Sequence, residues 1–315
     1  MIFNKDSAKL LEDLTPNSVD AIITDPPYGM GIMGNEWDRI LPPIDTWKAG
    51  LEVVKPGGFA LVFGHTRYYH RLGVQLEEAG FEIRDCLCWA YATGFPRSYD
   101  PSKHINNTEE AKKWIGWGTV LKPAWEPILV ARKPPEGTMV ENLLKYQTGV
   151  LNIDECRIPY ESEEDRKSLE SFMKFEGQDL GDSRYFSMNQ GGKKQVNVHP
   201  DGRWPANVLW LDPMYAHYDR FFLVPKPDKT EKRRYNLHDT VKPIELMERL
   251  ISLVTSKPSV IGRDVVVLDP FMGSGTTGVA CQKLNRSFIG YEIDTEQFET
   301  AGKRLSEKIM TDIFE

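Results

Sequence analysis

The sequence predicts an α/β protein built on a doubly wound, mostly parallel sheet. Short apolar runs of strand length alternate with segments of helical periodicity, beginning with the run 19–23, which only Asp20 interrupts. The same alternation returns in the last third of the chain, where the run 265–268 leads directly into a glycine-rich loop. Because parallel strands need long connections, usually helices, this order favours a sheet covered by helices on both faces.

Composition bounds the size and class of the protein. The 315 residues, 40% hydrophobic and 27% charged, leave room for one large α/β domain with an insertion, or for two domains. No apolar run approaches the ~20 residues of a membrane span, and the N-terminus lacks a signal-peptide pattern. None of the four cysteines forms a Cys-x-x-Cys pair, so we expect no metal site, reduced thiols and a cytoplasmic protein.

The first half of the chain alternates between expected helices and strands. A short helix is expected near 7–14 with Ser7 as its N-cap, and 29–45 is expected to be a mobile loop in which Trp37 is a lid residue or a core anchor. The other expected elements are helices over 46–54 (stopped by Pro56-Gly57-Gly58), 68–79 (ending at Gly80) and 109–114, and strands over 59–63, 81–91 and 126–131.

The middle of the chain, 134–237, differs in composition. Strand and helix signals become sparse there, while Gly, Asn, Ser and charged residues increase, which indicates an inserted surface region. We therefore divide the chain into 1–133, 134–237 and 238–315. The net charge of −7 counts against a nucleic-acid binder, but a local basic face can coexist with an acidic body. Candidate phosphate contacts in the insertion are Lys193, Lys194, Arg203, Lys229, Lys232, Arg233 and Arg234.

The last third of the chain regains a regular pattern. It begins with the segment Thr240-Val241-Lys242-Pro243. The expected elements are helices over 244–255, from the glycine loop to about 284, and over 295–309, with strands over 265–268 and 287–291.

Four residues after the first buried strand form a chemically unusual corner. Pro26 and Pro27 have no backbone N–H, so this stretch offers carbonyl oxygens beside the carboxylate of Asp25. Tyr28 adds a flat ring at the same place. A planar group that donates N–H protons fits such a corner, and the exocyclic amine of a nucleobase is a group of that kind.

The second candidate site is the glycine loop after the run 265–268. Gly273, Gly275 and Gly278 have GxGxxG spacing between a strand and a helix, and Glu292 ends the next strand, where a carboxylate can accept ribose hydroxyls. Asp269 precedes the glycines and would repel the pyrophosphate of a nicotinamide cofactor. It would attract the ammonium of S-adenosylmethionine, and the loop also lacks the Gly-Lys-Ser/Thr ending of an ATP site.

Three motifs together resemble the DNA amino-methyltransferases. Asp-Pro-Pro-Tyr at 25–28 is similar to the family's catalytic motif, and Asp-Pro-Phe-Met-Gly-Ser-Gly-Thr-Thr at 269–277 is similar to its cofactor motif. Thr-Val-Lys-Pro at 240–243 resembles the turn that contacts the methionine end of the cofactor. The order of the three resembles the beta arrangement of the family, with orphan or phage-type members the most alike.

This resemblance implies a Rossmann-like methyltransferase sheet with an inserted target-recognition region. It also implies S-adenosylmethionine as cofactor, double-stranded DNA as partner and homodimerisation as an option, since related enzymes often dimerise. The implied catalytic residues are Asp25, Pro26, Pro27 and Tyr28. The implied cofactor-binding residues are Thr240, Lys242, Asp269, Phe271, Gly273, Ser274, Gly275, Thr276 and Glu292.

The implied reaction is methyl transfer to an amine of a flipped base. Asp25 and the Pro26 carbonyl would accept the amine protons while Tyr28 stacks on the base. Family members with Asp at the first motif position mostly resemble adenine-N6 enzymes, so adenine is the expected target and cytosine-N4 the alternative. Three further functions stay open: an RNA- or protein-directed amino-methyltransferase, a dinucleotide-dependent oxidoreductase and a non-catalytic DNA-binding module.

Overall fold

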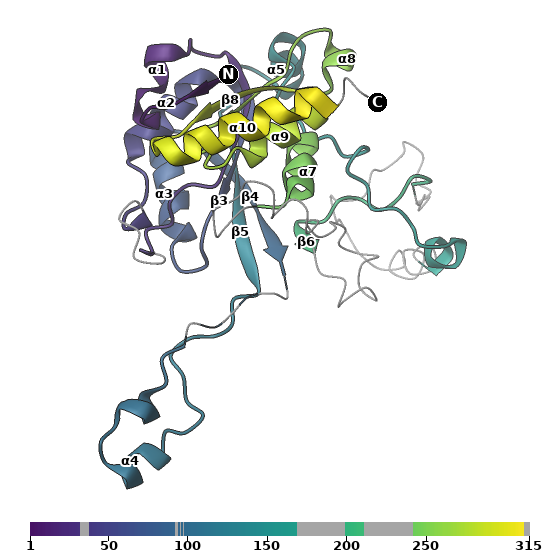
Figure 1. Ribbon diagram of the computed structural model, residues 1–315. Coiled ribbons are helices and arrows are strands. Elements are labelled where there is room, and N and C mark those ends of the chain that lie inside the picture. The colour runs from purple at the N-terminus through teal and green to yellow at the C-terminus, as the bar shows by residue number, and fades with distance from the viewer. Residues whose placement is uncertain are drawn as a thin grey trace.

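The computed structural model describes residues 1–31, 38–91, 94, 96, 98–168, 199–210 and 242–311. The fold is organised by one eight-stranded sheet of order β1-β8-β7-β2-β3-β5-β4-β6 (Figure 1). Its strands are β1 (Ile2–Phe3), β2 (Val19–Thr24), β3 (Val54–Phe63), β4 (Glu82–Ala90), β5 (Trp125–Arg132), β6 (Val208–Trp210), β7 (Val266–Asp269) and β8 (Ser287–Tyr291).

The predicted doubly wound, mostly parallel sheet is confirmed. All neighbouring strands pair in parallel except β5, which runs antiparallel to both β3 and β4. β2 and β7 lie side by side near the centre of the sheet. From β2 the chain continues to β3 on one side, and from β7 it continues to β8 on the other side. The order therefore reverses between β2 and β7, and open α/β sheets bind their ligands at the carboxyl ends of strands beside such a reversal.

Helices cover both faces of the sheet. One face carries α1 (Leu10–Asp13), α2 (Ile44–Val53) and α3 (Tyr69–Ala79), and the other carries α7 (Ile244–Val254), α9 (Thr276–Lys283) and α10 (Thr295–Thr311). Shorter helices are α4 (Thr108–Lys112), α5 (Met139–Tyr146), α8 (Pro258–Ile261) and two 3-10 turns, Ser7–Lys9 and Pro101–His104. No helix within the described ranges has the length and apolar character needed to cross a bilayer.

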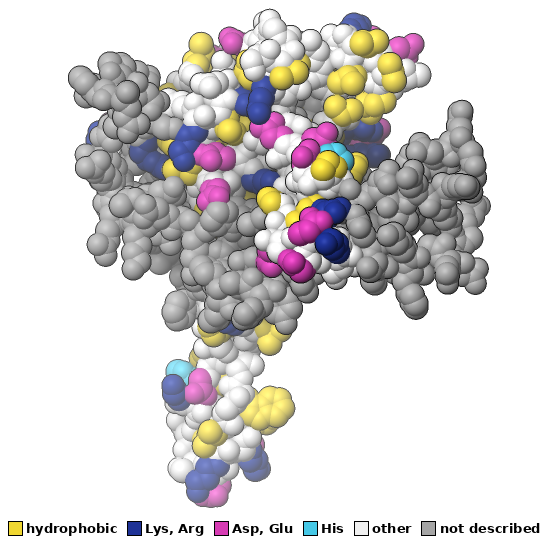
Figure 2. Space-filling view, turned by 90° about the vertical axis from the view of Figure 1, so that its right-hand side faces the viewer, with side chains coloured by type: hydrophobic (Ala, Val, Ile, Leu, Met, Phe, Trp, Pro, Cys, Tyr) yellow, Lys and Arg dark blue, Asp and Glu magenta, His cyan; other side chains and the backbone are white. Residues whose placement is uncertain are grey.

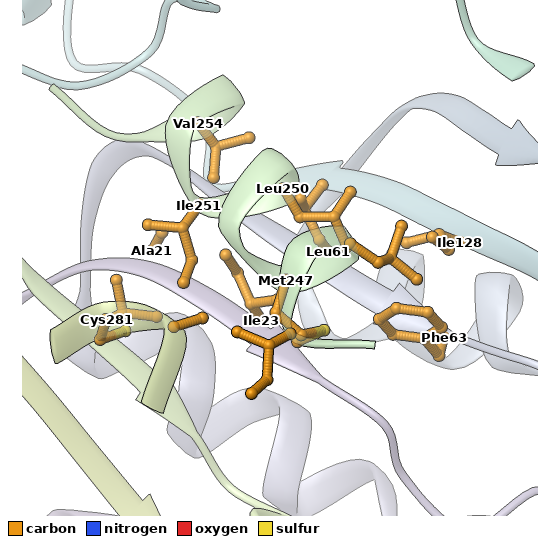
Figure 3. Close-up of a cluster of buried hydrophobic side chains, with 14 of the residues drawn as sticks. Ala21, Ile23, Leu61, Phe63, Ile128, Met247, Leu250, Ile251, Val254 and Cys281 are labelled. Carbon is orange, nitrogen blue, oxygen red and sulfur yellow. The ribbon is translucent and has the colours of Figure 1, made fainter. Parts of the chain in front are cut away.

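Alternation along the central strands divides the core into two layers. In β2, Ala21 and Ile23 pack toward α7, whereas Ile22 packs toward α2, because successive side chains of a strand point to opposite faces. Figure 3 shows the first layer, where Met247 and Leu250 of α7 meet the sheet. Each fully buried side chain of this kind contributes roughly 1.5–3 kcal/mol, so the position of α7 on the sheet is strongly fixed.

Asp20, the polar interruption in the first strand, is buried but fully paired. Its carboxylate accepts hydrogen bonds from Lys55 Nζ at 2.7 Å, from Arg263 Nη2 at 2.7 Å and from the backbone N–H of Val266 at 2.8 Å. It lies at the start of β2, and the corner residues follow the other end of the strand. The Asp20 carboxylate therefore links the start of β2 to β3 and to β7, at the end of the strand opposite to the candidate site.

Three local expectations were wrong. Asp6, rather than Ser7, caps the first helical turn by accepting from Ala8 N–H, while Ser7 is buried. The strand expected over 59–63 begins earlier, at Val54, so Pro56-Gly57-Gly58 lies within β3, where Gly57 N–H donates to Lys133 O at 3.0 Å and Lys133 N–H donates to Gly58 O at 2.9 Å. Helix α5 was not expected; Thr138 and Glu141 form a reciprocal capping box at its start.

A long arm, residues 98–124, leaves the sheet between β4 and β5 and carries α4 near its end (Figure 1). Neither of its two short helices contains a buried residue. Its apolar side chains are exposed among Lys, Asp and Glu side chains (Figure 2). The arm starts from the edge of the sheet where the corner residues lie, because β3 runs parallel to β2, and β3 and β4 both run antiparallel to β5, so that β2 and β4 end at the same edge. Tyr91 N–H donates to Ala124 O across the base of the arm.

Candidate active site

The two candidate motifs lie side by side at the point where the strand order reverses. The acceptor corner follows β2 and the glycine loop follows β7, and these strands pair directly through Ala21 with Val267 and Ile22 with Leu268. At the strand ends, Thr24 Oγ1 donates a 2.7 Å hydrogen bond to Asp269 Oδ1. Segments about 245 residues apart therefore form one edge of the sheet.

The acceptor corner is fixed by its own sequence and by one distant carboxylate. Because Pro26 and Pro27 have no N–H, the first backbone donor after Asp25 is that of Tyr28, and it donates to Asp38 Oδ1 at 2.6 Å. The Tyr28 hydroxyl donates to Asp25 Oδ1 at 2.5 Å. Burial and the nearby carboxylates raise the pKa of Tyr28 well above its ordinary value, so the phenol stays protonated and acts as a donor.

Lys242 lies in this corner, although it was expected at the methionine end of the cofactor. Its Nζ is 2.5 Å from Asp25 Oδ2, 3.2 Å from the Tyr28 hydroxyl and 3.3 Å from Glu126 Oε2. Its side chain is 9% exposed. Burial by itself lowers the pKa of Lys242, but the attraction of Asp25 and Glu126 outweighs burial and raises it, so the side chain is a cation at neutral pH.

Aromatic rings enclose the Lys242 ammonium. It lies 5.0 Å from the ring centroid of Phe63, 5.6 Å from that of Tyr28 and 5.8 Å from that of Trp89. Tyr91, which packs on Trp89 with centroids 5.3 Å apart, donates its hydroxyl to Glu126. The corner is therefore an aromatic-walled cluster of two carboxylates, one ammonium and two phenols.

The glycine loop has an open side. Gly273 and Gly275 have φ of +51° and +81°, a conformation that favours glycine, and a Cβ added at Gly273 would meet no atom within 4 Å. Gly278 instead permits close packing, since a Cβ there would lie 2.7 Å from the Phe288 ring. The Gly273 N–H donates to Glu292 Oε2 at 2.9 Å. The open cradle beside a carboxylate fits a ligand that approaches the backbone closely and carries hydroxyls or a cation.

Asp269, expected to touch the cofactor, is instead engaged with the protein. It is 3% exposed and accepts from Thr24, from Thr277 Oγ1 at 2.6 Å and from Phe271 N–H at 3.1 Å. Burial raises its pKa to about 6, and these hydrogen bonds oppose the shift. Asp269 thus joins the two motifs from within, where the sequence had indicated a carboxylate facing an ammonium.

The hydroxyls of the glycine loop are also occupied. Arg304 of α10 donates from Nη1 to Ser274 Oγ at 2.7 Å, to Ser274 O at 2.7 Å and to Thr276 Oγ1 at 3.2 Å. Ser274 and Thr276 are both buried, and Phe271 packs against Trp47 with ring centroids 6.0 Å apart. The loop therefore presents backbone rather than these side chains to its open side.

Among the candidate DNA contacts, Arg203 lies within the described part of the chain. It donates from Nη2 to Asp165 Oδ1 at 2.6 Å, lies 5.0 Å from the centroid of the Tyr160 ring and is 11% exposed, so it stabilises the insertion. The remaining candidates lie outside the described residues: Lys193, Lys194, Lys229, Lys232, Arg233 and Arg234. So do Thr240 and Trp37.

Sequence reasoning missed Glu126. It opens the expected strand 126–131, whereas ligands of a parallel sheet bind at the carboxyl ends of its strands. Because β5 runs antiparallel to its neighbours, its first residues lie at the edge where β3 and β4 end. A carboxylate opening an apolar strand is a signal only when the direction of that strand is known.

Comparisons with known proteins agree with this geometry. A family model described as "DNA methylase" matches residues 19–303. The type II methyltransferase M.HindIII of Haemophilus influenzae is 26% identical over 356 residues, covering 96% of this chain and 94% of its own length. M.HpaI of Haemophilus parainfluenzae is 27% identical, covering 94% of this chain and 71% of its own length.

Solved structures share the fold. The M1.HpyAVI–SAM complex has a TM-score of 0.51 at 24% identity and covers 97% of this chain and 99% of its own. The PvuII DNA methyltransferase, described as cytosine-N4-specific, also has a TM-score of 0.51, at 18% identity, covering 99% of this chain and 90% of its own. These similarities support the fold read from the sheet order.

Proposed function

We propose that this chain, which belongs to the DNA methylase family, transfers a methyl group from S-adenosylmethionine to the N6 amine of adenine in double-stranded DNA. The observation that carries the proposal is the direct contact between the two motifs. The acceptor corner of Asp25 and the loop of Gly273 follow paired strands, joined by the bond between Thr24 and Asp269. An amine held by one motif therefore lies beside whatever the other motif binds.

The glycine loop supports S-adenosylmethionine as the cofactor. Its open side at Gly273 admits a ligand next to the backbone, and Glu292 lies there as an acceptor for ribose hydroxyls. The cofactor supplies a methyl group on a cationic sulfur, and the carboxylates of the corner, Asp25 and Glu126, complement that charge. M1.HpyAVI, which shares the fold, was solved as a SAM complex.

In the proposed mechanism the target base is flipped out of the duplex and its amine enters the corner. Asp25 already accepts from Tyr28 and Lys242, but each carboxylate oxygen has a second lone pair. Asp25 and the Pro26 carbonyl accept the two amine protons, which orients the nitrogen lone pair toward the glycine loop. Positioning of this kind can supply roughly 7–11 kcal/mol of the barrier.

Adenine is proposed on the identity of one motif residue. Asp25 stands where adenine-N6 enzymes of the family mostly have Asp and cytosine-N4 enzymes mostly have Ser. The fold does not decide this point, because the PvuII enzyme, described as cytosine-N4-specific, shares it with a TM-score of 0.51. Cytosine-N4 is therefore the second candidate.

The arm supports duplex DNA as the substrate. Tyr91 precedes it in the chain and bonds to Ala124 at its end, and Glu126 follows it, so the arm leaves the body at the edge where the target base is proposed to enter. Trp114 and Trp117 near its end are 40% and 63% exposed, and side chains of this type stack on bases or enter grooves. We propose that the arm contacts the DNA. We also propose that the enzyme works in the cytoplasm and forms a homodimer, as related enzymes often do.

Two other functions explain less of the site, and a third differs only in its substrate. A dinucleotide-dependent oxidoreductase would use the glycine loop but leaves the Asp25 corner unexplained, and a non-catalytic DNA-binding module leaves the glycine cradle unexplained. An RNA- or protein-directed amino-methyltransferase would use both motifs. The family match and the arm favour DNA over these two substrates.

Long-read sequencing of DNA from a methylation-free host that expresses the chain tests the proposal. The expected result is N6-methyladenine at one short sequence, absent from a host that expresses Asp25→Ala. N4-methylcytosine would overturn the adenine assignment. Unmodified DNA from a host with soluble protein, together with methylated RNA or protein, would overturn DNA as the substrate.

A further inference from the structure

We propose that Lys242 and Glu126 are positioning residues: Lys242 keeps the Asp25 and Glu126 carboxylates ionised side by side, and Glu126 holds Lys242 and Tyr28 in place around Asp25. The inference rests on the proposed function and extends it, since it explains how Asp25 is kept in the state that accepts amine protons. It concerns residues on two elements, β5 and the segment before α7, that the catalytic motif does not contain.

The geometry shows one cation shared between two carboxylates. Lys242 Nζ is 2.5 Å from Asp25 Oδ2 and 3.3 Å from Glu126 Oε2. The Tyr28 hydroxyl makes the same bridge, with 2.5 Å to Asp25 Oδ1 and 3.3 Å to Glu126 Oε2. In both cases the contact to Asp25 is the shorter one, so Asp25 is the primary partner and Glu126 fixes the direction from which both donors approach.

Charge requires such a cation here. Two carboxylates that share a partly buried site repel each other, and without compensation one of them takes up a proton. A protonated Asp25 would lose acceptor capacity and would no longer favour the positive charge that develops on the target nitrogen. With Lys242 present the three side chains sum to one negative charge, which complements a cationic methyl donor.

The groups around the cluster do not replace Lys242. Burial lowers the pKa of His65, whose ring centroid lies 6.2 Å from that of Tyr28, so it is neutral at neutral pH. Burial, together with Glu126, raises the pKa of Tyr91, so it remains a neutral donor. Asp38 and Asp269 add negative charge from neighbouring segments. Within the described chain, Lys242 is the cation in contact with both carboxylates.

A purely structural ion pair makes a different prediction from a charge-compensating one. If Lys242 only stabilises the fold, replacing it lowers stability and activity alike at every pH. If Lys242 keeps the carboxylates ionised, its loss shifts the acidic limb of the pH–rate profile to higher pH. Removing the second carboxylate, Glu126, then shifts the limb back to lower pH. The second mutation would then partly rescue the first.

The experiment compares wild type, Lys242→Met, Glu126→Gln and the double variant, using an oligonucleotide duplex that carries the site found by sequencing. We expect Lys242→Met to raise the midpoint of the acidic limb of kcat by about 1–3 pH units. We expect the double variant to recover most of that shift, and Glu126→Gln alone to lower kcat without moving the limb upward. Lys242→Arg, which keeps the charge, should keep the wild-type limb.

Infrared difference spectroscopy gives a readout independent of turnover. A protonated-carboxyl band at neutral pH is expected in Lys242→Met and is expected to be absent from wild type and from the double variant. If Lys242→Met does not fold, as judged by circular dichroism, Lys242→Gln replaces it in both arms. The inference would be overturned if Lys242→Met kept the wild-type midpoint of the acidic limb and showed no protonated-carboxyl band.

These outcomes separate the inference from the proposed function. A wild-type protein that methylates no DNA base contradicts the proposed function, whereas the infrared arm still tests the Lys242–Glu126 pair. A wild type that methylates cytosine leaves the pH comparison valid, because the same corner would hold that amine. Only the pattern among the four proteins decides whether Lys242 compensates charge.

Discussion

Thr24 and Asp269 are joined by a 2.7 Å hydrogen bond between Oγ1 and Oδ1, although 245 positions separate them in the sequence. Thr24 is the last residue before the acceptor corner, and Asp269 is the last residue of the strand before the glycine loop. Asp269 also accepts from Thr277 at the start of α9. One buried carboxylate therefore sets the relative position of the two motifs between which the methyl group is proposed to be transferred.

The burial of Asp269 predicts a specific pH dependence of stability. Burial raises its pKa from 3.8 to about 6, so the folded state favours the protonated form. Its stabilising contribution is fully present below the unfolded pKa and is lost as pH rises through about 6, by about 3 kcal/mol. Asp269→Asn has no such titration. Urea unfolding of both proteins between about pH 4 and about pH 7 should show that the free energy of unfolding of the variant increases relative to that of wild type as pH rises. A difference in unfolding free energy that stays constant with pH would contradict this.

Asp25→Ala is expected to abolish methyl transfer while leaving cofactor binding largely intact. The variant removes the acceptor for the amine protons, and loss of a single such electrostatic contact typically costs about 10²–10³ in kcat. Incorporation of labelled methyl groups measures the rate, and calorimetry measures cofactor affinity. Asp45→Ala, at an exposed carboxylate on α2, is the matched control. Near-normal turnover by Asp25→Ala would refute the mechanism.

Glu292→Ala is expected to weaken cofactor binding rather than the chemical step. Glu292 accepts from Gly273 N–H and is proposed to accept ribose hydroxyls, and hydrogen bonds to a charged group are worth about 1.5–3 kcal/mol. We expect an increase in Kd of about 10- to 100-fold in calorimetry, with kcat at saturating cofactor little changed. Glu296→Ala, exposed on α10, should bind normally. Unchanged affinity in Glu292→Ala would remove the carboxylate from the cofactor site.

Asp20→Ala is expected to destabilise the fold strongly. It leaves Lys55, Arg263 and the Val266 N–H without their shared acceptor, and breaking a buried ion pair costs about 3–5 kcal/mol. Chemical denaturation measures the loss. Lys48→Ala, which removes an exposed ion pair with Asp45 at 3.5 Å, should cost less than about 1 kcal/mol. Equal losses in the two variants would show that the Asp20 cluster is not a principal support of the sheet.

The double variant Trp114→Ala/Trp117→Ala is expected to weaken DNA binding. In the wild type, the rings of Trp114 and Trp117 form an edge-to-face pair on the arm, with centroids 5.6 Å apart. Stacking of an aromatic side chain on a base is worth about 1–3 kcal/mol. Fluorescence anisotropy with duplex DNA should show a Kd raised about tenfold or more, with cofactor affinity unchanged. Val260→Ala, an exposed apolar residue on α8, is the control. Unaltered DNA affinity would exclude the arm from the interface.

The sequence was informative wherever a local interaction decides the structure. Gly80 ends α3 in a left-handed conformation with φ of +108°, as expected, because glycine adopts that conformation without steric cost. The strand expected over 81–91 is observed as Glu82–Ala90. The strand before the glycine loop and the glycine turn at Gly275 were also expected, since apolar runs of strand length followed by turn residues are local signals. The prediction of Ser7 as the N-cap was wrong, because Asp6 and Ser7 are both residues that favour this position. In the structure Ser7 is buried and Asp6 caps the turn.

The sequence by itself determined the doubly wound sheet and the two motifs, because apolar periodicity, paired prolines and glycine spacing are properties of short segments. The tertiary structure alone decided which side chains meet: Lys242 with Asp25, Glu126 with Tyr28, and Thr24 with Asp269. These contacts depend on strand direction and on pairing between segments far apart in the chain. The antiparallel course of β5 brings Glu126 to the site. The buried Asp269 accepts hydrogen bonds from Thr24 and Thr277 and so connects the two motifs.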